Sequence, residues 1–266
     1  MDKYFNGKVA LITGASSGIG EALVYAFSSE GSRVIAASID KTELDRVVAN
    51  CSGFAGSVRP VIFDLSDTGN IEQVVADLIS DEGHIDILLN LGGVSQRATI
   101  LETPLWLDRK IMEINYFGTI ALTKAVLPYM IANGGGQIAA TSSITGRFGF
   151  PLRSAYSASK QALHGFFETL IIEYKKDNIN ASVFIPGRVR TNISVHALTA
   201  SGREHGKMDA GQAGGITPEI AAKMIIKGLK KNKREILVGS SELLMLKIRK
   251  YMPSLFFRLA GRIKSM

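Results

Sequence analysis

Three residues in the middle of the chain could together move a proton. Tyr156 and Lys160 lie four residues apart in the run Tyr-Ser-Ala-Ser-Lys, and Ser143 lies thirteen residues upstream. On a helix such a spacing puts the phenol and the ammonium on one face. A fixed cation favours the phenolate and would bring the tyrosine pKa, ordinarily about 10, toward working pH. The pair suits making or breaking an alcohol O–H bond, although alone it also fits surface packing.

A glycine-rich segment near the N-terminus has the context of a nucleotide site. The apolar run Val9–Ile12 is typical of a strand buried on both faces, and the helical stretch 21–29 follows soon after. Between them lies Thr13-Gly14-Ala15-Ser16-Ser17-Gly18-Ile19-Gly20. The glycines would let the backbone approach a pyrophosphate, and the helix start would offer N–H groups to it. This position between strand and helix favours nucleotide binding over a simple tight turn.

The rest of the chain alternates strand-like and helix-like segments. Further strands are expected at residues 33–37, 58–63, 85–89, 136–141, 180–185 and 235–238, and helices at 42–51, 71–81, 105–132, 154–176 and 218–231. The alternation predicts an α/β fold, a single-domain Rossmann-type doubly wound parallel sheet of about seven strands with helices on both faces. Ligands of such sheets bind beyond the carboxyl ends of the strands, which is where the polar motifs fall.

Composition excludes several classes of protein. With 266 residues, 46% of them hydrophobic, the chain can bury one sizeable core. A single cysteine excludes an internal disulfide framework and fits a reducing compartment. The polar start and the lack of an apolar stretch of about 18 residues predict a cytoplasmic protein without a signal peptide or a spanning helix. The histidines show no metal-ligand spacing, so no metal is expected; they are His84, His164, His196 and His205.

Five motifs, in order and spacing, resemble the short-chain dehydrogenase/reductase family between about Lys8 and Gly239. They are Thr13-Gly14-x-x-x-Gly18-x-Gly20, Asn115, Ser143, Tyr156-x-x-x-Lys160 and Pro186-Gly187. The resemblance implies an oxidoreductase that transfers a hydride between a nicotinamide dinucleotide and a carbonyl or secondary alcohol. The alternative is a non-catalytic dinucleotide-binding sensor or scaffold, against which the complete set of motifs argues.

The resemblance also implies roles for single residues. Tyr156 would be the acid/base, Lys160 would tune the phenol and hold the nicotinamide ribose, and Ser143 would orient the substrate oxygen. Asn115 would hold a water in the proton relay and interrupt its helix. Asp64 would meet the adenine; Thr191 would contact the carboxamide, although a helix N-cap explains it equally well. The implied cofactor contacts are Gly14, Ser16, Ser17, Gly18, Ile19, Gly20, Ser38, Asp64, Leu65, Asn90, Gly92, Tyr156, Lys160, Pro186, Gly187, Val189 and Thr191.

Two segments depart from the family pattern. After the fourth expected strand the family usually has Asn-Asn-Ala-Gly, whereas this chain has Asn90-Leu91-Gly92-Gly93. The polar bonding lost at Leu91 must be met differently. The second expected strand ends in Ser38-Ile39-Asp40-Lys41, where an acidic residue favours NAD and a basic one favours NADP. Ser38 and Lys41 could accept a 2′-phosphate and Asp40 could oppose it. We favour NADP(H), with NAD(H) as the alternative.

The basic character of the chain is confined to its end. Residues 223–266 hold 12 basic and 2 acidic side chains, net +10, whereas residues 1–222 hold 19 and 22, net −3. Residues 241–266, beyond a catalytic domain at 1–240, form an amphipathic tail that would lie on an anionic membrane surface or pack over the active-site cleft or a partner subunit. No recognition motif supports nucleic-acid binding.

The tail and a glycine-rich segment shape the remaining expectations. Pro253-x-Leu255-Phe256-Phe257 and the stretch 202–209 resemble the branch of the family linked to membrane-associated, lipid-type carbonyl reduction. Residues 192–216 lack an apolar period and are expected to form a mobile lid over a small-molecule substrate. By analogy with relatives, the helices predicted at 105–132 and 154–176 would pair subunits into a homodimer or homotetramer.

Overall fold

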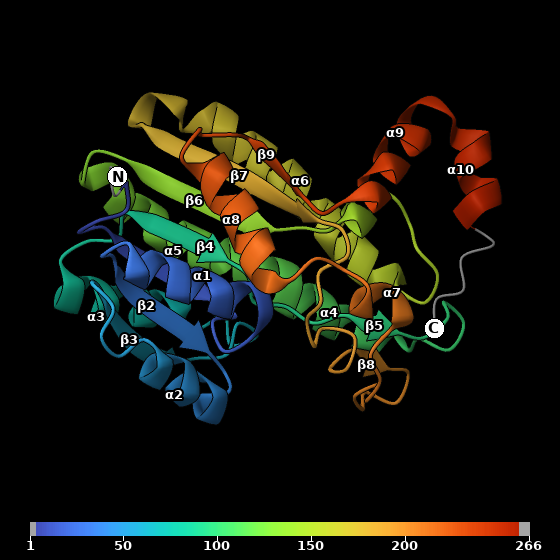
Figure 1. Ribbon diagram of the computed structural model, residues 1–266, viewed down its shortest axis with the longest axis horizontal. Coiled ribbons are helices and arrows are strands. Elements are labelled where there is room, and N and C mark those ends of the chain that lie inside the picture. The colour runs from blue at the N-terminus through green and yellow to red at the C-terminus, as the bar shows by residue number, and fades with distance from the viewer. Residues whose placement is uncertain (1–3, 261–266) are drawn as a thin grey trace.

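The computed structural model describes residues 4–260, and a seven-stranded parallel sheet forms its centre (Figure 1). The strand order is β3-β2-β1-β4-β6-β7-β9. The strands are β1 (Val9–Thr13), β2 (Arg33–Ser38), β3 (Ser57–Ile62), β4 (Ile87–Asn90), β6 (Gly136–Thr141), β7 (Ile179–Pro186) and β9 (Glu235–Val238). The predicted doubly wound sheet is confirmed. The order reverses between β1 and β4, so the carboxyl ends of these two strands border the crevice where such sheets bind ligands.

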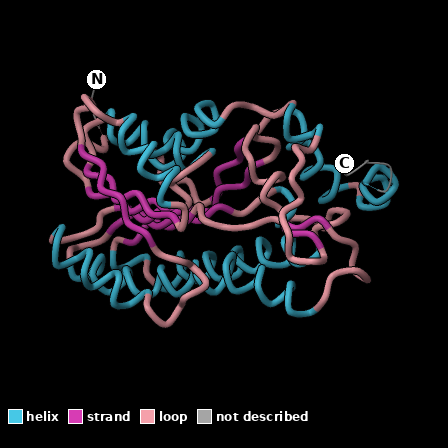
Figure 2. The backbone as a smooth tube through the Cα atoms, turned by 90° about the horizontal axis from the view of Figure 1, so that it is seen from below, coloured by secondary structure: helices cyan, strands magenta, loops and turns pink. Residues whose placement is uncertain are grey.

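Two helical layers cover the sheet, as Figure 2 shows. One face packs against α1 (Gly18–Ser29), α2 (Lys41–Asn50) and α8 (Pro218–Leu229), and the other against α3 (Ile71–Glu82), α5 (Gly118–Ala132) and α6 (Ser154–Glu173). All five residues of β1 are buried, and alternate ones enter the two cores. The continuous apolar run that predicted this strand is therefore a consequence of burial on both faces.

The helix predicted over 105–132 is interrupted. α4 (Leu105–Met112) passes into a π-helical turn at Glu113–Phe117 before α5 begins. Such turns are rare and occur often at functional sites. The interruption places Asn115 at its centre, as expected for this residue. The helix predicted over 154–176 was too long, since α6 ends at Glu173 and a 3-10 turn follows at Lys175–Asp177.

A smaller group of elements lies beyond the carboxyl edge of the sheet. It contains the two-stranded sheet β5 (Gln96–Arg97) and β8 (Leu198–Thr199), the short helix α7 (Ala210–Ala213), and the tail helices α9 (Leu244–Tyr251) and α10 (Pro253–Ala260). Figure 1 shows α9 and α10 projecting from this end. The sequence did not predict β5 and β8, because two-residue strands have no periodicity to detect. Between residues 4 and 260, no helix has the length and apolar character needed to cross a bilayer.

Candidate active site

Some of the predicted catalytic and cofactor residues line one cleft at the carboxyl edge of the sheet, and Lys160, Asn115 and most of the glycine-rich loop lie outside its lining. Ser143 follows β6, Tyr156 lies in the first turn of α6, and the loop after β7 supplies a third side. Members of both predicted sets line this cleft: Ile19, Ser143, Tyr156, Pro186, Gly187, Val189 and Thr191. Segments far apart in the sequence therefore meet where the sheet topology predicts a ligand.

Tyr156 and Lys160 lie side by side on α6 as the i,i+4 spacing predicted. Both are buried, and the Lys160 Nζ lies 5.9 Å from the centroid of the Tyr156 ring. The same Nζ donates to the carbonyl oxygen of Thr141, the last residue of β6, at 2.8 Å. This bond ties the ammonium to the sheet and fixes its position behind the phenol.

The ionisation of the pair differs from the sequence-based prediction. Burial raises the pKa of the Tyr156 phenol, and the Ser143 side chain and the charges of Arg153 and Arg97 lower it by less. Burial also lowers the pKa of Lys160 to about 8. The predicted fall of the tyrosine pKa was therefore wrong for this structure, because desolvation of the phenolate outweighs its neighbours. A phenol that keeps its proton is suited to act as an acid.

Ser143 is held by the turn that follows it. Its Oγ accepts hydrogen bonds from the Thr145 backbone N–H at 3.2 Å and from the Thr145 hydroxyl at 3.1 Å. The preceding Ser142 donates its hydroxyl to the Lys160 carbonyl oxygen at 2.8 Å. The loop after β6 is thereby attached to α6, which sets the Ser143 hydroxyl against Tyr156 in the same cleft.

Asn115 is fully buried and uses its side chain as a clamp. Its Oδ1 accepts from the Val94 N–H at 2.8 Å, and its Nδ2 donates to the Val94 carbonyl at 2.9 Å and to the Ser159 hydroxyl at 3.0 Å. A Cβ added to Gly93 would lie 2.8 Å from Asn115 Oδ1 and 3.3 Å from Lys160 Nζ. Asn115 therefore borders the lysine and holds the 93–94 segment beside it.

The glycine-rich loop has the close packing that a phosphate cradle requires. Gly14 and Gly18 have positive φ values of 64° and 56°. A side chain at Gly20 would collide with the Gly14 carbonyl oxygen, and one at Gly18 would lie 2.8 Å from the Thr191 side chain. These glycines let the loop close over the start of α1, which offers unpaired backbone N–H groups. Ser17 is the N-cap of that helix.

The end of β2 is arranged around two hydroxyl groups. Ser38 donates to the Ser16 Oγ at 2.8 Å, and Ile39 beside it is 67% exposed. Asp40 caps α2 by accepting from the Glu43 N–H at 3.0 Å. The sequence analysis missed Arg46, whose guanidinium lies 3.4 Å from the Ser16 carbonyl and pairs with Glu21 and Glu43.

The segments after β3 and β4 close the crevice between them. The Leu91 and Gly92 N–H groups both donate to the Thr13 hydroxyl at 3.0 Å, which replaces the side-chain bonding that the leucine removes. Asn90 turns inward and donates to the Ala139 carbonyl at 3.2 Å. A side chain at Gly92 would meet Leu65. Asp64 is exposed at the end of β3, where its Oδ1 accepts from the Ser66 N–H.

Three charged side chains that the sequence analysis missed face the same cleft. Arg97 of β5 and Arg153, next to α6, both pair with Asp209 of the predicted lid, each with a 2.6 Å contact to Oδ2. Burial and the charge of Arg97 lower the pKa of Arg153 to about 10. Residues 192–216 contain β8 and α7 and are held at Asp209.

One face of the tail forms part of the cleft wall. Phe256 of α10 is buried, with its ring centroid 4.8 Å from that of Phe148. Met245 and Ala260 line the cleft beside it. The same two helices leave Tyr251 and Phe257 largely exposed, at 71% and 64%. The described part of the tail, α9 and α10, therefore packs over the active-site cleft, one of the three predicted alternatives, and keeps an outward apolar surface.

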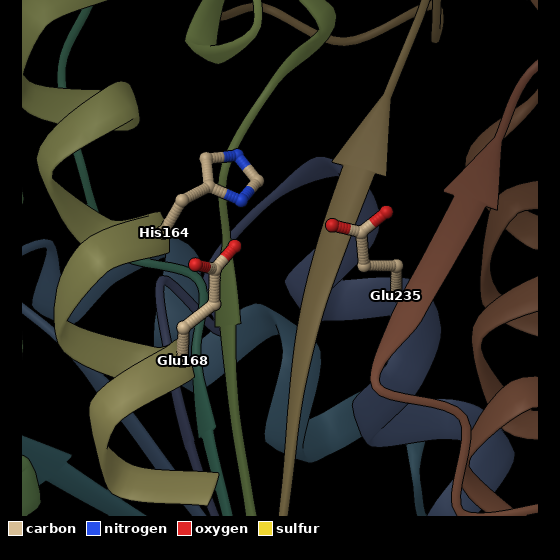
Figure 3. Close-up of side chains that lie close together, drawn as sticks. All are labelled: His164, Glu168 and Glu235. Atoms are coloured by element: carbon tan, nitrogen blue, oxygen red, sulfur yellow. The ribbon is translucent and has the colours of Figure 1, made fainter. Parts of the chain in front are cut away.

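A histidine lies behind the site with two carboxylates, as Figure 3 shows. The ligand atoms of His164, Glu168 and Glu235 lie within 4.8 Å of one another, a cluster that sequence spacing did not reveal. His164 Nε2 contacts the Ser142 Oγ at 2.8 Å, whereas Nδ1 has no partner within residues 4–260. Arg147 forms a salt bridge with Glu235. We assign no metal here, because the guanidinium already supplies the opposite charge.

Comparisons with known proteins agree with this geometry. The family model described as short chain dehydrogenase matches residues 8–201. A "Dehydrogenase/reductase SDR family protein 7-like" of Anopheles gambiae is 43% identical over 242 residues, 89% of this chain and 76% of the relative. A "Dehydrogenase/reductase SDR family member 7B" of Danio rerio is 38% identical over 258 residues, 94% and 84% of the two chains.

A solved structure shares the fold. The short-chain dehydrogenase/reductase from Burkholderia phymatum in complex with NAD superposes with a TM-score of 0.83, covers 94% of this chain and 95% of its own, and is 22% identical. At that identity the likeness shows the fold alone. Together with the family match and the relatives of about 40% identity, it establishes that the chain belongs to the short-chain dehydrogenase family, whose members are oxidoreductases.

Proposed function

We propose that the protein is an NADP(H)-dependent reductase of a carbonyl substrate. In the reverse direction the same site would oxidise a secondary alcohol. The observation that carries the proposal is the meeting of Tyr156 and Ser143 with Ile19 of the glycine-rich segment in one cleft, with the Lys160 Nζ 5.9 Å from the centroid of the Tyr156 ring. The loop, Thr191 against Gly18 and the Ser16–Ser38 hydroxyl pair suit a dinucleotide. When bound, the nicotinamide would supply or accept the hydride.

The chain's own residues would handle the proton. The Ser143 hydroxyl would hydrogen-bond the carbonyl oxygen and set it toward Tyr156, whose buried phenol retains the proton that this oxygen needs. Lys160 would stabilise the phenolate left behind and bind the nicotinamide ribose. Asn115 would act through Lys160, because it holds the 93–94 segment against the ammonium.

The preference for NADP(H) rests on the end of β2. No carboxylate stands at position 38 to accept from a ribose hydroxyl, and Asp40 is engaged at the start of α2. Arg46 reaches the Ser16 carbonyl while paired with Glu21 and Glu43, so a 2′-phosphate would compete with these carboxylates for its guanidinium. An exposed site with hydroxyls and a nearby guanidinium favours a 2′-phosphate over a hydroxyl.

Exposed surfaces support two further proposals, one on membrane contact and one on assembly. We propose a cytoplasmic protein that contacts anionic membranes through the outward face of α9 and α10, where Tyr251 and Phe257 lie near Lys250 and Arg258. We also propose a homodimer or homotetramer. Phe117, Tyr129 and Ile172 are exposed on the π-turn, α5 and α6, the helical region through which such proteins pair.

Tyr156→Phe tests the enzymatic proposal. The affinity for NADPH, measured by the fluorescence of the cofactor, should stay within about twofold of the wild-type value. The rate of NADPH oxidation with a panel of ketones and aldehydes should fall by about 10²- to 10⁴-fold. Ser157→Ala, one residue away on α6, is the matched control. Turnover that survives in Tyr156→Phe would remove the tyrosine from the mechanism. A wild type that binds NADPH but reduces no member of the panel would favour the sensor or scaffold alternative.

A further inference from the structure

The cluster of Arg97, Arg153 and Asp209 sits beside Tyr156 in the cleft. Arg97 and Asp209 are each 8% exposed, and the Arg153 side chain is 12% exposed. Arg153 is the N-cap of α6 and Tyr156 lies in the first turn of that helix, so the charge of the guanidinium acts on the phenol. The three charged groups and the phenol line the same cavity.

The charges of this cleft do not balance. Among the charged side chains that line it, Arg97, Arg153 and Asp209 are nearly buried and leave one positive charge in excess, whereas Arg188 is exposed. Glu242 accepts from the backbone N–H groups of Arg188 and Ser240, at 2.9 and 3.0 Å. Burying an unbalanced charge is costly, so the excess near Asp209 points to a negative partner.

Anchoring of the lid through Asp209 explains the position of Arg97 but not that of Arg153. Arg97 alone pairs with both carboxylate oxygens of Asp209, through Nε at 3.3 Å and Nη2 at 2.6 Å. Arg153 shares only Oδ2 and donates from Nη1 to the Pro151 carbonyl at 3.2 Å. Its remaining N–H groups have no acceptor among residues 4–260, although a guanidinium carries five donors.

The side chains around the arginines indicate the chemical character of the rest of the ligand. Apolar side chains from four segments face the cavity around the arginines: Ile144, Phe148, Phe150, Ile193, Met245 and Phe256. The Arg153 guanidinium lies 4.8 Å from the centroid of the Phe150 ring, which holds it against this wall. The cavity thus combines a cationic position near Tyr156 with an apolar wall formed by these segments.

We propose that Arg153, with Arg97, binds an anionic group of the substrate, a carboxylate or a phosphate monoester, close to the carbonyl that Tyr156 protonates. The apolar wall takes the hydrocarbon part of the same molecule. This inference rests on the proposed function, and it names the substrate class of that site. Arg153 is then a specificity-determining residue, and the substrate anion competes with Asp209 for its guanidinium.

The test compares carbonyl substrates with and without the anionic group on the same hydrocarbon chain, using the NADPH-loaded enzyme. One pair is 3-oxodecanoate and its methyl ester, and the other is 2-oxodecyl phosphate and 1-hydroxydecan-2-one. We expect kcat/KM to be at least about tenfold higher for the anion of the preferred pair. Arg153→Gln should lower kcat/KM for the anionic substrate by about ten- to a hundredfold and leave kcat/KM for its neutral partner within about threefold of the wild-type value. The pair with the larger ratio identifies carboxylate or phosphate as the source.

Conservative and distant variants separate charge from structure. Arg153→Lys should recover part of the selectivity, and Arg203→Gln, a lid arginine outside the cavity lining, should change neither member of a pair. Equal kcat/KM for both members of both pairs, or an equal loss in Arg153→Gln, would overturn the anion site and leave the reductase proposal standing.

Calorimetry of the NADPH complex supplies a readout without turnover. Decanoate and decyl phosphate are compared with decanol: anion-selective binding that Arg153→Gln loses supports the site even if no ketone is reduced, and binding without selectivity overturns it. If Arg153→Gln does not fold, the same calorimetry with Asp209→Asn tests the proposal. Loss of the competing carboxylate should raise the affinity for the anion severalfold, and an unchanged or lower affinity counts against the proposal.

Discussion

The two sides of the cleft are built by different means. The dinucleotide side, residues 9–65 with 90–93, consists of loops that follow consecutive strands, and close backbone packing shapes it. The substrate side, formed by β5, the lid and the tail, is held by contacts between side chains far apart in sequence, such as Arg97 with Asp209 and Phe148 with Phe256. Under the proposed function, the first side would hold the cofactor through the backbone, whereas the second would set selectivity through single side chains.

Glycine replacement should have the largest effect and should act only on the dinucleotide side. In Gly20→Ala, the new methyl group would collide with the Gly14 carbonyl, so the loop must move. We expect at least a hundredfold loss of NADPH affinity, measured by fluorescence titration. Gly165→Ala is the control, because a Cβ there meets nothing within 4 Å. Unchanged affinity in Gly20→Ala would show that the loop does not bind the dinucleotide.

Cofactor preference should respond to the end of β2. Ser38→Asp places a carboxylate beside the Ser16 hydroxyl, where it would repel a 2′-phosphate and accept from a ribose hydroxyl. The ratio of kcat/KM for NADPH to that for NADH should fall by about ten- to a hundredfold. Ser38→Asn, similar in size without the charge, should change the ratio much less. A wild type that already prefers NADH would contradict the NADP(H) proposal at once.

The contrast between the two sides explains which features of the site could be predicted from the sequence. Strand, loop and helix patterns are local, so Gly14–Gly20, Tyr156 and Lys160 could be singled out from their spacing together with the other motifs of the family. Asp209 lies 112 residues from Arg97, and no periodicity connects a two-residue strand to a lid. The direction of the tyrosine pKa depends on burial, which sequence spacing does not report. Asn90 was predicted from its motif, but only the packing shows that its side chain turns toward Ala139.

The tail offers a matched test of the substrate side. Phe256→Ala would remove a buried ring from the cleft wall, whereas Phe257→Ala would remove the neighbouring ring, which is 64% exposed. We expect Phe256→Ala to raise KM for the carbonyl substrate by about tenfold and to leave NADPH affinity unchanged. The control should leave both constants unchanged and weaken binding to anionic vesicles. An equal effect of both variants on KM would indicate that the tail acts by general stability.

The smallest effect is expected behind the site, where His164 joins α6 to Ser142. Burial, reinforced by the charge of Arg147, lowers the pKa of His164 to about 4, well below its ordinary value of 6.5. Between these values the unfolded chain binds a proton that the folded protein excludes, so stability present above pH 6.5 is lost as pH falls toward 4. Glu168 and Glu235, the nearby carboxylates, would oppose this loss by stabilising a charged imidazole.

Replacement of His164 should therefore flatten the acid side of the stability curve. His164→Gln should reduce the loss of unfolding free energy between pH 7 and pH 5 by roughly 1–2 kcal/mol, measured by urea unfolding at each pH. His196→Gln is the control, because its ring is exposed beside Glu204. The two sides of the cleft meet at β6 and α6, which His164 joins. If unfolding free energy falls equally with pH in His164→Gln and in the wild type, exclusion of a proton from His164 does not govern the acid stability of this junction.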